Sequence, residues 1–476
     1  MHPLALRLSV LAIILAATSK KIGRIIPEPY LDEVFHIPQA QAYCRNAFDV
    51  WDPKLTTPAG LYILSYPLRF FDACSPQFLR GINAFGIAYA LPVVVYLIWQ
   101  TLHEEGSALD GIASQVAMNV ALFPVLYFFG GLYYTDVWST IFVMAAYLAT
   151  LRMKPWVAGV FAWISLWFRQ TNIVWVAFMA GVYAVCRVAE LEEEHTGKSA
   201  AEEQKKPDTK ENENPGWLKE VKLHDPNISG NIKSIDFVRT PLSILVVALR
   251  YLPSLLVSMI PYILVLLSFV VFLVSNNFTI VLGDATAHQA SIHIPQLLYF
   301  TAATTFFSFP LYLPLVPRMI RRLPSPITII LLAAMSYAVY YNTVLHPYLM
   351  ADNRHYAFYV FRKLLLRFPP YSLLVPAPAY LVAMYLQREA LNVTLSWAIF
   401  YVAATTITLI SAPLVEPRYF IIAWTVWRVH VKEMRMWVLL MEAAWLVVVN
   451  AVTIYLFLMK PFEWAHEPGV LQRFMW

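Results

Sequence analysis

The sequence predicts an all-α membrane protein, a polytopic bundle of about 12 to 13 transmembrane helices. Of its 476 residues, 59% are hydrophobic and only 14% are charged, whereas about a quarter of the residues of an ordinary soluble domain are charged. Many separate apolar runs approach the roughly 20 residues that a helix needs to span a bilayer. The sequence lacks the alternating segments that are typical of the strands of a membrane barrel. Composition and run length together therefore favour a helical bundle.

Basic connections between the apolar runs predict which ends of the helices face the cytoplasm. They are "RMK" (152–154), "PRMIRRLPS" (317–325) and "RVHVKEMRM" (428–436). Positively charged loops are retained on the cytoplasmic side, so these loops also explain the net charge of +5 without a nucleic-acid partner. The first apolar segment has only a weak cleavage site, and we expect an uncleaved helix with a cytoplasmic N-terminus.

A polar segment at 187–240 divides the chain into two membrane halves. It is rich in Glu, Lys, Asn and Pro, a composition typical of disorder, and we expect a disordered cytoplasmic loop. The N-terminal half (1–186) then carries a long first lumenal loop at 20–80. The C-terminal half (241–476) has one ambiguous connection, "FRKLLLRFPP" (361–370). We place "EPRY" (416–419) in the lumen, which makes 356–369 a short interfacial or broken helix.

The first lumenal loop opens on the stretch "EPYLDEVFHIPQAQAYC" (28–44). Asp32 and His36 are four residues apart and share one face of a helical turn, whereas Glu33 is rotated from that face by about 100°. One interpretation is that Asp32 caps the helix. The other is that the proline-bracketed turn holds a carboxylate as a general base. Asp32 and Glu33 both remain candidates for that base.

Further polar side chains lie in the connections that this topology places on the lumenal side. Ionisable residues at membrane depth are costly and are therefore functional candidates. In "WDPKLTTPAGLY" (51–62), aromatic and acidic side chains are able to stack on a sugar and bind its hydroxyls, although a structural role is equally compatible with them. The candidate substrate-binding residues are His36, Trp51, Asp52, Tyr62, Asp136, Arg169, Gln170, Asp284, His288, His293, Asp352, Asn353, Arg354, His355, Glu416 and Arg418.

Arg354 and Arg418 are the best candidates for binding a phosphate, because a guanidinium presents a rigid fork of donors to it. For Arg418, a salt bridge with Glu416 or snorkelling at a helix end is the structural alternative. We expect the lumenal blocks to converge on one cavity lined by Asp32, His36, Asp284, His288, Asp352, Arg354 and Arg418.

Neither the histidines nor the cysteines predict a metal centre. His288 and His293 do not have a standard zinc spacing. Cys44, Cys74 and Cys186 lie far apart, so their spacing indicates neither a zinc site nor a disulfide framework. We expect no metal ion and no cofactor.

Taken in order, seven blocks of this sequence resemble a known family of enzymes. The blocks are "EPYLDEVFHIPQAQAYC", "WDPKLTTPAGLY", "YYTD", "FRQTNIVWV", "GDATAHQASIHIPQLLYF", "HPYLMADNRHYAFYV" and "LVEPRYFI". Together they resemble the dolichyl-phosphate-glucose-dependent alpha-1,2-glucosyltransferases of the endoplasmic reticulum. The resemblance spans nearly the whole chain outside the charged loop.

The resemblance implies a type C glycosyltransferase fold with a lumenal active site in the endoplasmic reticulum membrane. It also implies a donor, dolichyl phosphate glucose, and an acceptor, the diglucosylated dolichyl-diphosphate oligosaccharide. A beta-linked donor that gives an alpha product requires inversion in a single displacement, with one base on the acceptor hydroxyl. The alternative is a polytopic transporter or lipid scramblase, from which we would expect repeated halves and broken helices near the midplane.

Overall fold

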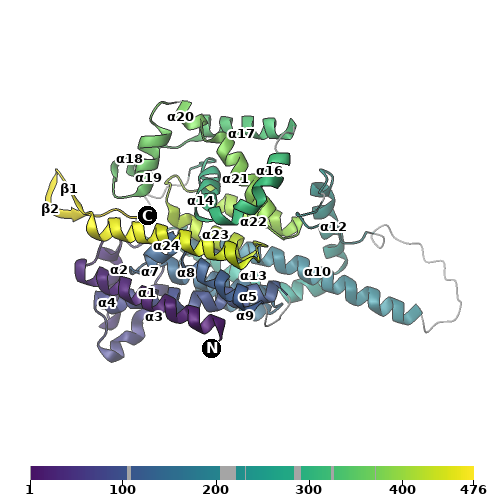
Figure 1. The fold of residues 1–476 in the computed structure, drawn as a ribbon. Helices are drawn as coiled ribbons and strands as arrows, with labels where there is room; N and C mark the ends of the chain where they lie inside the picture. Colours follow the sequence, from purple (N-terminus) through teal and green to yellow (C-terminus); the bar gives the residue numbers. More distant parts are fainter. Residues whose placement is uncertain are drawn as a thin grey trace.

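The computed structural model describes residues 2–103, 109–203, 221–230, 232–283, 291–322, 326–369 and 371–476. The predicted all-α class is confirmed. Most of the long helices run roughly along one direction and form a bundle, with one small β-hairpin at one end (Figure 1).

The N-terminal half is built from helices joined by short turns. They are α1 (Pro3–Ile25), α2 (Glu33–Cys44), α3 (Gly60–Ser65), η1 (Tyr66–Phe71), α4 (Pro76–Phe85), η2 (Gly86–Ala90), α5 (Leu91–Leu102), α6 (Asp110–Ala121), α7 (Pro124–Gly130), α8 (Asp136–Leu151), α9 (Pro155–Leu166), η3 (Gln170–Asn172) and α10 (Ile173–Glu203).

The C-terminal half contains more short helices and ends in the hairpin. Its elements are α12 (Asp236–Arg250), α13 (Leu252–Ser275), α14 (Gln296–Phe307), α15 (Phe309–Tyr312), η5 (Leu313–Leu315), α16 (Val316–Arg322), α17 (Pro326–Asn342), α18 (Pro347–Ala351), α19 (Tyr356–Val360), η6 (Phe361–Leu365), α20 (Tyr371–Leu374), α21 (Ala377–Ala390), α22 (Leu395–Ile410), η7 (Pro417–Phe420), α23 (Ile421–Val429), α24 (Met436–Met459), β1 (Phe462–Trp464) and β2 (Glu467–Gln472).

Fewer helices reach membrane-spanning length than the sequence predicted. By length and composition, the described residues contain five such helices, or up to seven if each of two bent pairs is one span. Four more apolar helices, α8, α9, α17 and α22, are shorter, at 10–17 residues. A proline follows each bend. α6 and α7 meet at 69° at Phe123, which precedes Pro124, and proline disfavours helical backbone in the residue before it. The second pair meets at 87° at Ser308, two residues before Pro310, which lacks the N–H that a continuous helix would use.

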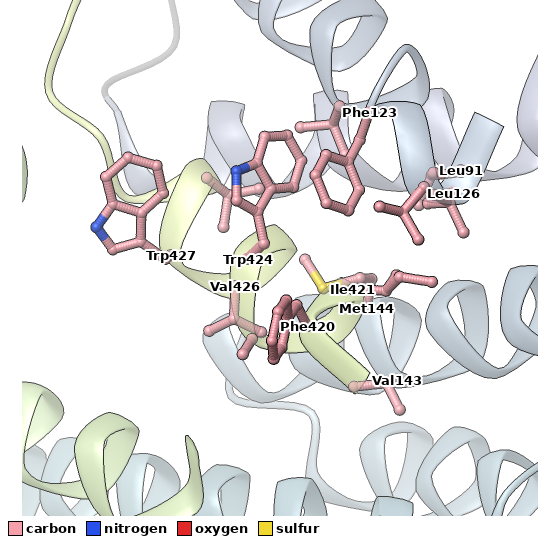
Figure 2. Packing of buried hydrophobic residues seen from close by; sticks show 14 of the residues in the cluster. Leu91, Phe123, Leu126, Val143, Met144, Phe420, Ile421, Trp424, Val426 and Trp427 are labelled. Atoms are coloured by element: carbon pink, nitrogen blue, oxygen red, sulfur yellow. The ribbon is translucent and has the colours of Figure 1, made fainter. Parts of the chain in front are cut away.

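Aromatic packing joins the two halves of the chain in the centre of the bundle. The rings of Phe123 and Trp424 stack with centroids 4.0 Å apart (Figure 2). Trp424 also donates its Nε1 hydrogen to Ser308 Oγ at 3.1 Å, which satisfies the one polar atom of a large buried ring. This core fixes α23, and with it the turn at 416–420 that precedes α23.

A chain of polar side chains crosses the same core. Arg7 donates to Gln115, Gln115 to Asn119, and Asn119 to Glu442 Oε2 at 2.7 Å. Glu442 also pairs with Arg428 at 2.5 Å, and both side chains are fully buried. The hydrogen bonds connect α1, α6, α24 and α23, so they fix the register of four helices against one another.

The loop at 187–240, which we expected to be disordered throughout, is ordered in part. Residues 187–203 continue helix α10, and α12 begins at Asp236. Between them, Asp225 accepts hydrogen bonds from the backbone and side chain of Ser396, and Ile228 N donates to Val393 O at 2.9 Å. Residues 204–220 and 231 lie outside the described ranges. Sequence composition therefore overestimated the disorder, because long-range contacts hold the ends of this loop.

Residues 356–369, where we expected a short interfacial or broken helix, contain one short helix that ends before Leu366. α19 continues into a single π-helical turn, η6, which ends at Leu365. α2, α18, α19 and the β1–β2 hairpin lie at one end of the molecule, and α12 lies at the other end (Figure 1). The elements that flank the Asp32 turn and the 352–355 block thus lie at the same end of the bundle.

Candidate active site

A strained turn precedes α2 and presents Asp32. Leu31 has a φ of 53°, in the left-handed region, which is uncommon for a residue other than glycine and is often found at functional sites. Asp32 immediately precedes α2, but its carboxylate makes no hydrogen bond to the helix backbone. The interpretation of Asp32 as a helix cap alone is therefore wrong.

The Asp32 carboxylate faces an arginine from a distant part of the chain. Arg418 Nη1 donates to Asp32 Oδ2 at 2.9 Å, and Glu416 Oε2 accepts from the same guanidinium at 2.7 and 3.0 Å. The Asp32 side chain is 46% exposed, against 17% for Arg418. Burial would raise the pKa of Asp32, but the positive charge of Arg418 and the hydrogen bond from it lower the pKa below its ordinary value. Asp32 is thus an ionised, accessible carboxylate.

Glu33 has different surroundings, although it is the next residue. It is fully buried and pairs with Arg80 of α4 through both carboxylate oxygens, at 2.6 and 2.9 Å. Its oxygens also accept hydrogen bonds from the backbone N–H groups of Tyr30 and Tyr133. Glu33 therefore locks the Tyr30–Asp32 turn onto α4 and the segment before α8, and none of its oxygens is left for a substrate.

His36 lies one turn after Asp32, and both contact Tyr134. The Tyr134 hydroxyl accepts the Asp32 N–H at 3.2 Å, and the rings of His36 and Tyr134 are 6.2 Å apart. His36 Nδ1 also hydrogen-bonds the hydroxyl of the buried Tyr62 at 2.7 Å. Burial lowers the pKa of His36 to about 4, so the imidazole is neutral at neutral pH.

A second ion pair lies behind this cluster. Arg169 Nη2 forms an ion pair with Asp136 Oδ1 at 2.9 Å. The charges of both residues act on His36, and the charge of Asp136 acts on Arg418. Within the described part of the chain, Arg169 Nε and Asp136 Oδ2 have no hydrogen-bond partner. Arg169 therefore keeps a donor that is not committed to the protein.

The 51–58 loop is held close to these residues by tight backbone packing. Gln170 Nε2 donates to Thr56 O at 2.9 Å, and Gly60 N donates to Trp167 O at 2.8 Å. A Cβ on Gly60 would lie 2.5 Å from that oxygen. On the other side of the loop, Gly283 has a φ of +65° and packs against the carbonyls of Pro53 and Leu55. Only glycine permits both approaches.

Three predicted site residues of this region have structural contacts. Asp52 Oδ1 accepts the backbone N–H of Lys54 and closes its own turn. Trp51 packs edge to face on Tyr62, with ring centroids 6.0 Å apart. The Gln170 side chain is bonded to the backbone carbonyl of Thr56. Their positions support the loop, and contact with a substrate stays a prediction for them.

The 352–355 block forms its own cluster. Asp352 accepts two side-chain hydrogen bonds from Arg354, at 2.8 Å from Nε and 2.6 Å from Nη2. Asn353 Oδ1 accepts from Trp464 Nε1 at 2.7 Å. His355 is close enough to Asp32 for its charge to act on that carboxylate. Asp32 and the 352–355 block therefore lie on the same side of the molecule, as expected.

His293 holds the chain that leads to Arg418. Its backbone N–H donates to Ile410 O, and its Nδ1 lies 3.3 Å from Pro413 O. The ring is fully buried. His293 therefore positions this part of the chain and is not exposed to a substrate. Two other predicted residues of this segment, Asp284 and His288, lie outside the described residues.

An apolar pocket of about 300 Å³ opens beside the 51–58 loop, which contributes Pro58 to its lining. It lies between α9 and α13 and is lined by Trp163, Trp167, Phe269 and Phe272. Gln170, the neighbour of Arg169, belongs to the same lining. The cavity is therefore apolar, and it touches the residue that follows Arg169 in the chain.

Several structural residues escaped the sequence analysis. A disulfide joins Cys44 to Cys74, and their common location in the predicted lumenal loop was a usable signal, because disulfides form in oxidising compartments. Arg80 was a lone charge in an apolar run, which is itself a sign of a buried partner. In the described ranges, no group of three or more His, Cys, Asp or Glu side chains is placed to hold a metal ion.

Comparisons with known proteins agree over the length of the chain. The sequence model of the DIE2/ALG10 family matches residues 26–429. A protein of Emericella nidulans named Dol-P-Glc:Glc(2)Man(9)GlcNAc(2)-PP-Dol alpha-1,2-glucosyltransferase is 31% identical, over 96% of this chain and 95% of its own length. Proteins with the same name from rat and human are 33% and 32% identical, over 95% of this chain and 94% of their own lengths. No solved structure matches.

The family match covers most of the chain, including the turn that carries Asp32 and the 416–420 turn that carries Arg418. The chain therefore belongs to the DIE2/ALG10 family.

Proposed function

We propose that this protein transfers glucose from dolichyl phosphate glucose to the diglucosylated dolichyl-diphosphate oligosaccharide, forming an alpha-1,2 linkage. The observation that carries the proposal is the accessible, ionised Asp32, placed beside Arg418 in a chain whose relatives bear the name of this activity over nearly their whole lengths. The protein is a multi-pass membrane protein, and the endoplasmic reticulum follows from the activity.

Asp32 is the proposed general base. In an inverting transfer, the acceptor oxygen forms a bond to the anomeric carbon while the bond from that carbon to the phosphate oxygen breaks. The phosphate leaves on the lipid with the electron pair, and the Asp32 carboxylate takes the proton of the acceptor hydroxyl. Arg418 keeps this carboxylate ionised before the acceptor arrives. The type C glycosyltransferase fold implied by the resemblance stays a prediction.

Arg169 is the proposed phosphate ligand, ahead of Arg354 and Arg418. The guanidinium forks of Arg354 and Arg418 are already filled by Asp352 and Glu416. Arg169 uses one nitrogen for Asp136 and keeps Nε uncommitted within the described chain. The apolar pocket that Gln170 lines is of a kind to accept the first isoprenoid units of the donor, and this supports a phosphate position near Arg169.

The lumenal orientation is supported by two observations. The Cys44–Cys74 disulfide joins the end of α2, the helix that Asp32 precedes, to the turn before α4, and disulfides persist in oxidising compartments. The basic 428–436 connection lies with the ends of the polar loop, since Asn392 bonds both His430 and Asn227. Both segments were predicted to be cytoplasmic.

A single assay tests the proposal against the transporter alternative. Purified protein is incubated with a short-chain dolichyl phosphate glucose and the diglucosylated acceptor, and the product is read by mass spectrometry. We expect one added hexose in alpha-1,2 linkage. Movement of either lipid between leaflets without an added hexose would instead support a transporter or scramblase.

The phosphate assignment has its own test. Removing the Arg169 guanidinium deletes charge-assisted hydrogen bonds, each of which contributes about 1.5 to 3 kcal/mol. Arg169→Ala should therefore raise the KM for the lipid donor about 10- to 100-fold and leave the KM for the acceptor nearly unchanged. A larger donor defect in Arg354→Ala would return the role to Arg354, which the sequence favoured.

A further inference from the structure

The last segment of the chain, 462–476, runs beside the 352–355 block. After strands β1 and β2, Met475 pairs with His355 as in a parallel sheet: Met475 N donates to Arg354 O at 2.9 Å, and Tyr356 N donates to Met475 O at 3.1 Å. The sequence alone indicates no role for this segment, because the segment contains none of the seven quoted blocks.

Side chains of the hairpin fix the orientation of the block. Gln472 Oε1 accepts from Arg354 Nη1 at 3.2 Å, and the Arg354 guanidinium lies 4.8 Å from the centre of the Trp464 ring. Trp464 also donates its Nε1 hydrogen to Asn353. The His355 ring is held through Nδ1 by the main-chain oxygen of Trp476 at 3.0 Å.

The same segment reaches the turn that carries Asp32. Arg473 N donates to the Tyr30 hydroxyl at 2.8 Å, and that hydroxyl lies 3.2 Å from Arg473 O. The Arg473 side chain is buried and donates to Phe457 O and Leu458 O in the last turn of α24. The segment is therefore anchored to a membrane helix and touches both parts of the site.

These parts need external support. The 352–355 block lies between α18 and α19, which have five residues each, and helices this short are not stable alone. The Tyr30–Asp32 turn contains the left-handed Leu31, a backbone state that persists only where its surroundings enforce it. Neither segment can set its own position.

We propose that residues 462–476 are a positioning element of the active site, which sets the 352–355 block and the Asp32 turn relative to each other. The catalytic consequence rests on the proposed function, whereas the geometric part does not. The residues act through others: Gln472 and Trp464 through Arg354 and Asn353, and Arg473 through Tyr30.

Hydrogen–deuterium exchange tests the geometric part without any activity. The double variant Trp464→Phe/Gln472→Leu keeps the ring under Arg354 but removes the hydrogen bonds to Asn353 and Arg354. We expect faster exchange of the amides of 350–360 than in the wild type. The matched control is Val470→Ala, on the exposed side of the same strand β2, and it should exchange like the wild type. Unchanged exchange in the double variant would overturn the proposal.

Transfer kinetics test the catalytic part. A displacement of about 1 Å in a site can reduce turnover up to about a hundredfold, so we expect kcat of Gln472→Leu to fall about 10- to 100-fold. In an Arg354→Ala background, Gln472→Leu should have no additional effect. Additive losses would contradict positioning through Arg354. A wild type that transfers no glucose refutes the proposed function, while the exchange result still decides the geometry.

Discussion

At the scale of single residues, the two neighbouring carboxylates at the start of α2 differ in burial, and this difference gives them different roles. Asp32 is 46% exposed and has one arginine partner. Glu33 is fully buried with Arg80 and two backbone donors. A substrate hydroxyl can reach the first carboxylate and not the second.

Substituting the Asp32 carboxylate should change the rate of transfer, and substituting the Glu33 carboxylate should change the stability of the fold. Asp32→Asn cannot accept a proton, so kcat should fall about 10²- to 10⁴-fold, with the melting temperature unchanged. Glu33→Gln leaves the buried Arg80 without a counter-charge, which costs about 3 to 5 kcal/mol of stability, so its melting temperature should fall. Transfer rates and thermal unfolding of both variants check this, and a fully active Asp32→Asn would remove Asp32 from the chemistry.

His36 makes stability depend on pH. Its pKa falls from the ordinary value of 6.5 to about 4 because the folded protein buries it. The unfolded chain thus binds the proton more readily, so the stabilisation is complete above pH 6.5 and is lost as the pH falls toward 4. The charges of four residues also act on the His36 imidazole: Asp32, Asp136, Arg169 and Arg418.

The melting temperature of the wild type should therefore decrease between pH 7 and pH 5. His36→Gln, which keeps a polar group for Tyr62, should decrease less over the same range. Parallel curves for the two proteins would contradict the assignment of this pH dependence to His36.

At the scale of elements, the Cys44–Cys74 bond joins the end of α2 to the turn before α4 across a separation of 30 residues. The loop that it closes contains Trp51, Tyr62 and Gly60, which pack against the site. Constraining a loop of this length in the unfolded chain contributes about 3 to 4 kcal/mol in the chain-entropy account.

Cys44→Ser should accordingly lower the melting temperature and reduce transfer, and a reducing agent should have the same effect on the wild type. Cys186→Ser is the control, because Cys186 is a free, exposed cysteine. If thiol labelling finds three free cysteines in the untreated wild type, the disulfide is not formed and the argument for the lumenal side weakens.

At the scale of the whole molecule, the chain of contacts from Arg7 to Arg428 connects the two halves of the bundle. Its central pair, Arg428 and Glu442, is fully buried. Removing one member of a buried pair is strongly destabilising, whereas replacing both by apolar residues is often neutral.

The melting temperature in detergent should follow the same logic. Arg428→Leu and Glu442→Leu should each destabilise the protein by about 3 to 5 kcal/mol, and the double variant Arg428→Leu/Glu442→Leu should recover most of that loss. If the stability lost by the double variant equals the sum of the two single losses, the ion pair itself is indispensable.

The sequence was sufficient for the features that depend on local composition and order. Hydrophobic runs predicted the all-α membrane class, and the spacing of Asp32 and His36 predicted one shared face. Partners that are distant in the sequence could not be predicted, because nothing local in Glu33 indicates Arg80, and nothing local in Arg354 indicates Gln472. The lengths of the single helices could not be predicted either, because apolar runs do not reveal where a helix bends or stops.

The buried Arg428–Glu442 pair also bears on how the chain enters the membrane. A charged side chain costs about 2.5 to 3.5 kcal/mol at the centre of an inserting helix on a translocon scale, and this is an upper bound for Arg428 and Glu442, which lie near helix ends. The two residues are only 14 positions apart, on α23 and α24, so a helical hairpin can present them to the translocon as a neutral pair. We therefore expect α23 and α24 to insert together, as one unit of membrane biogenesis.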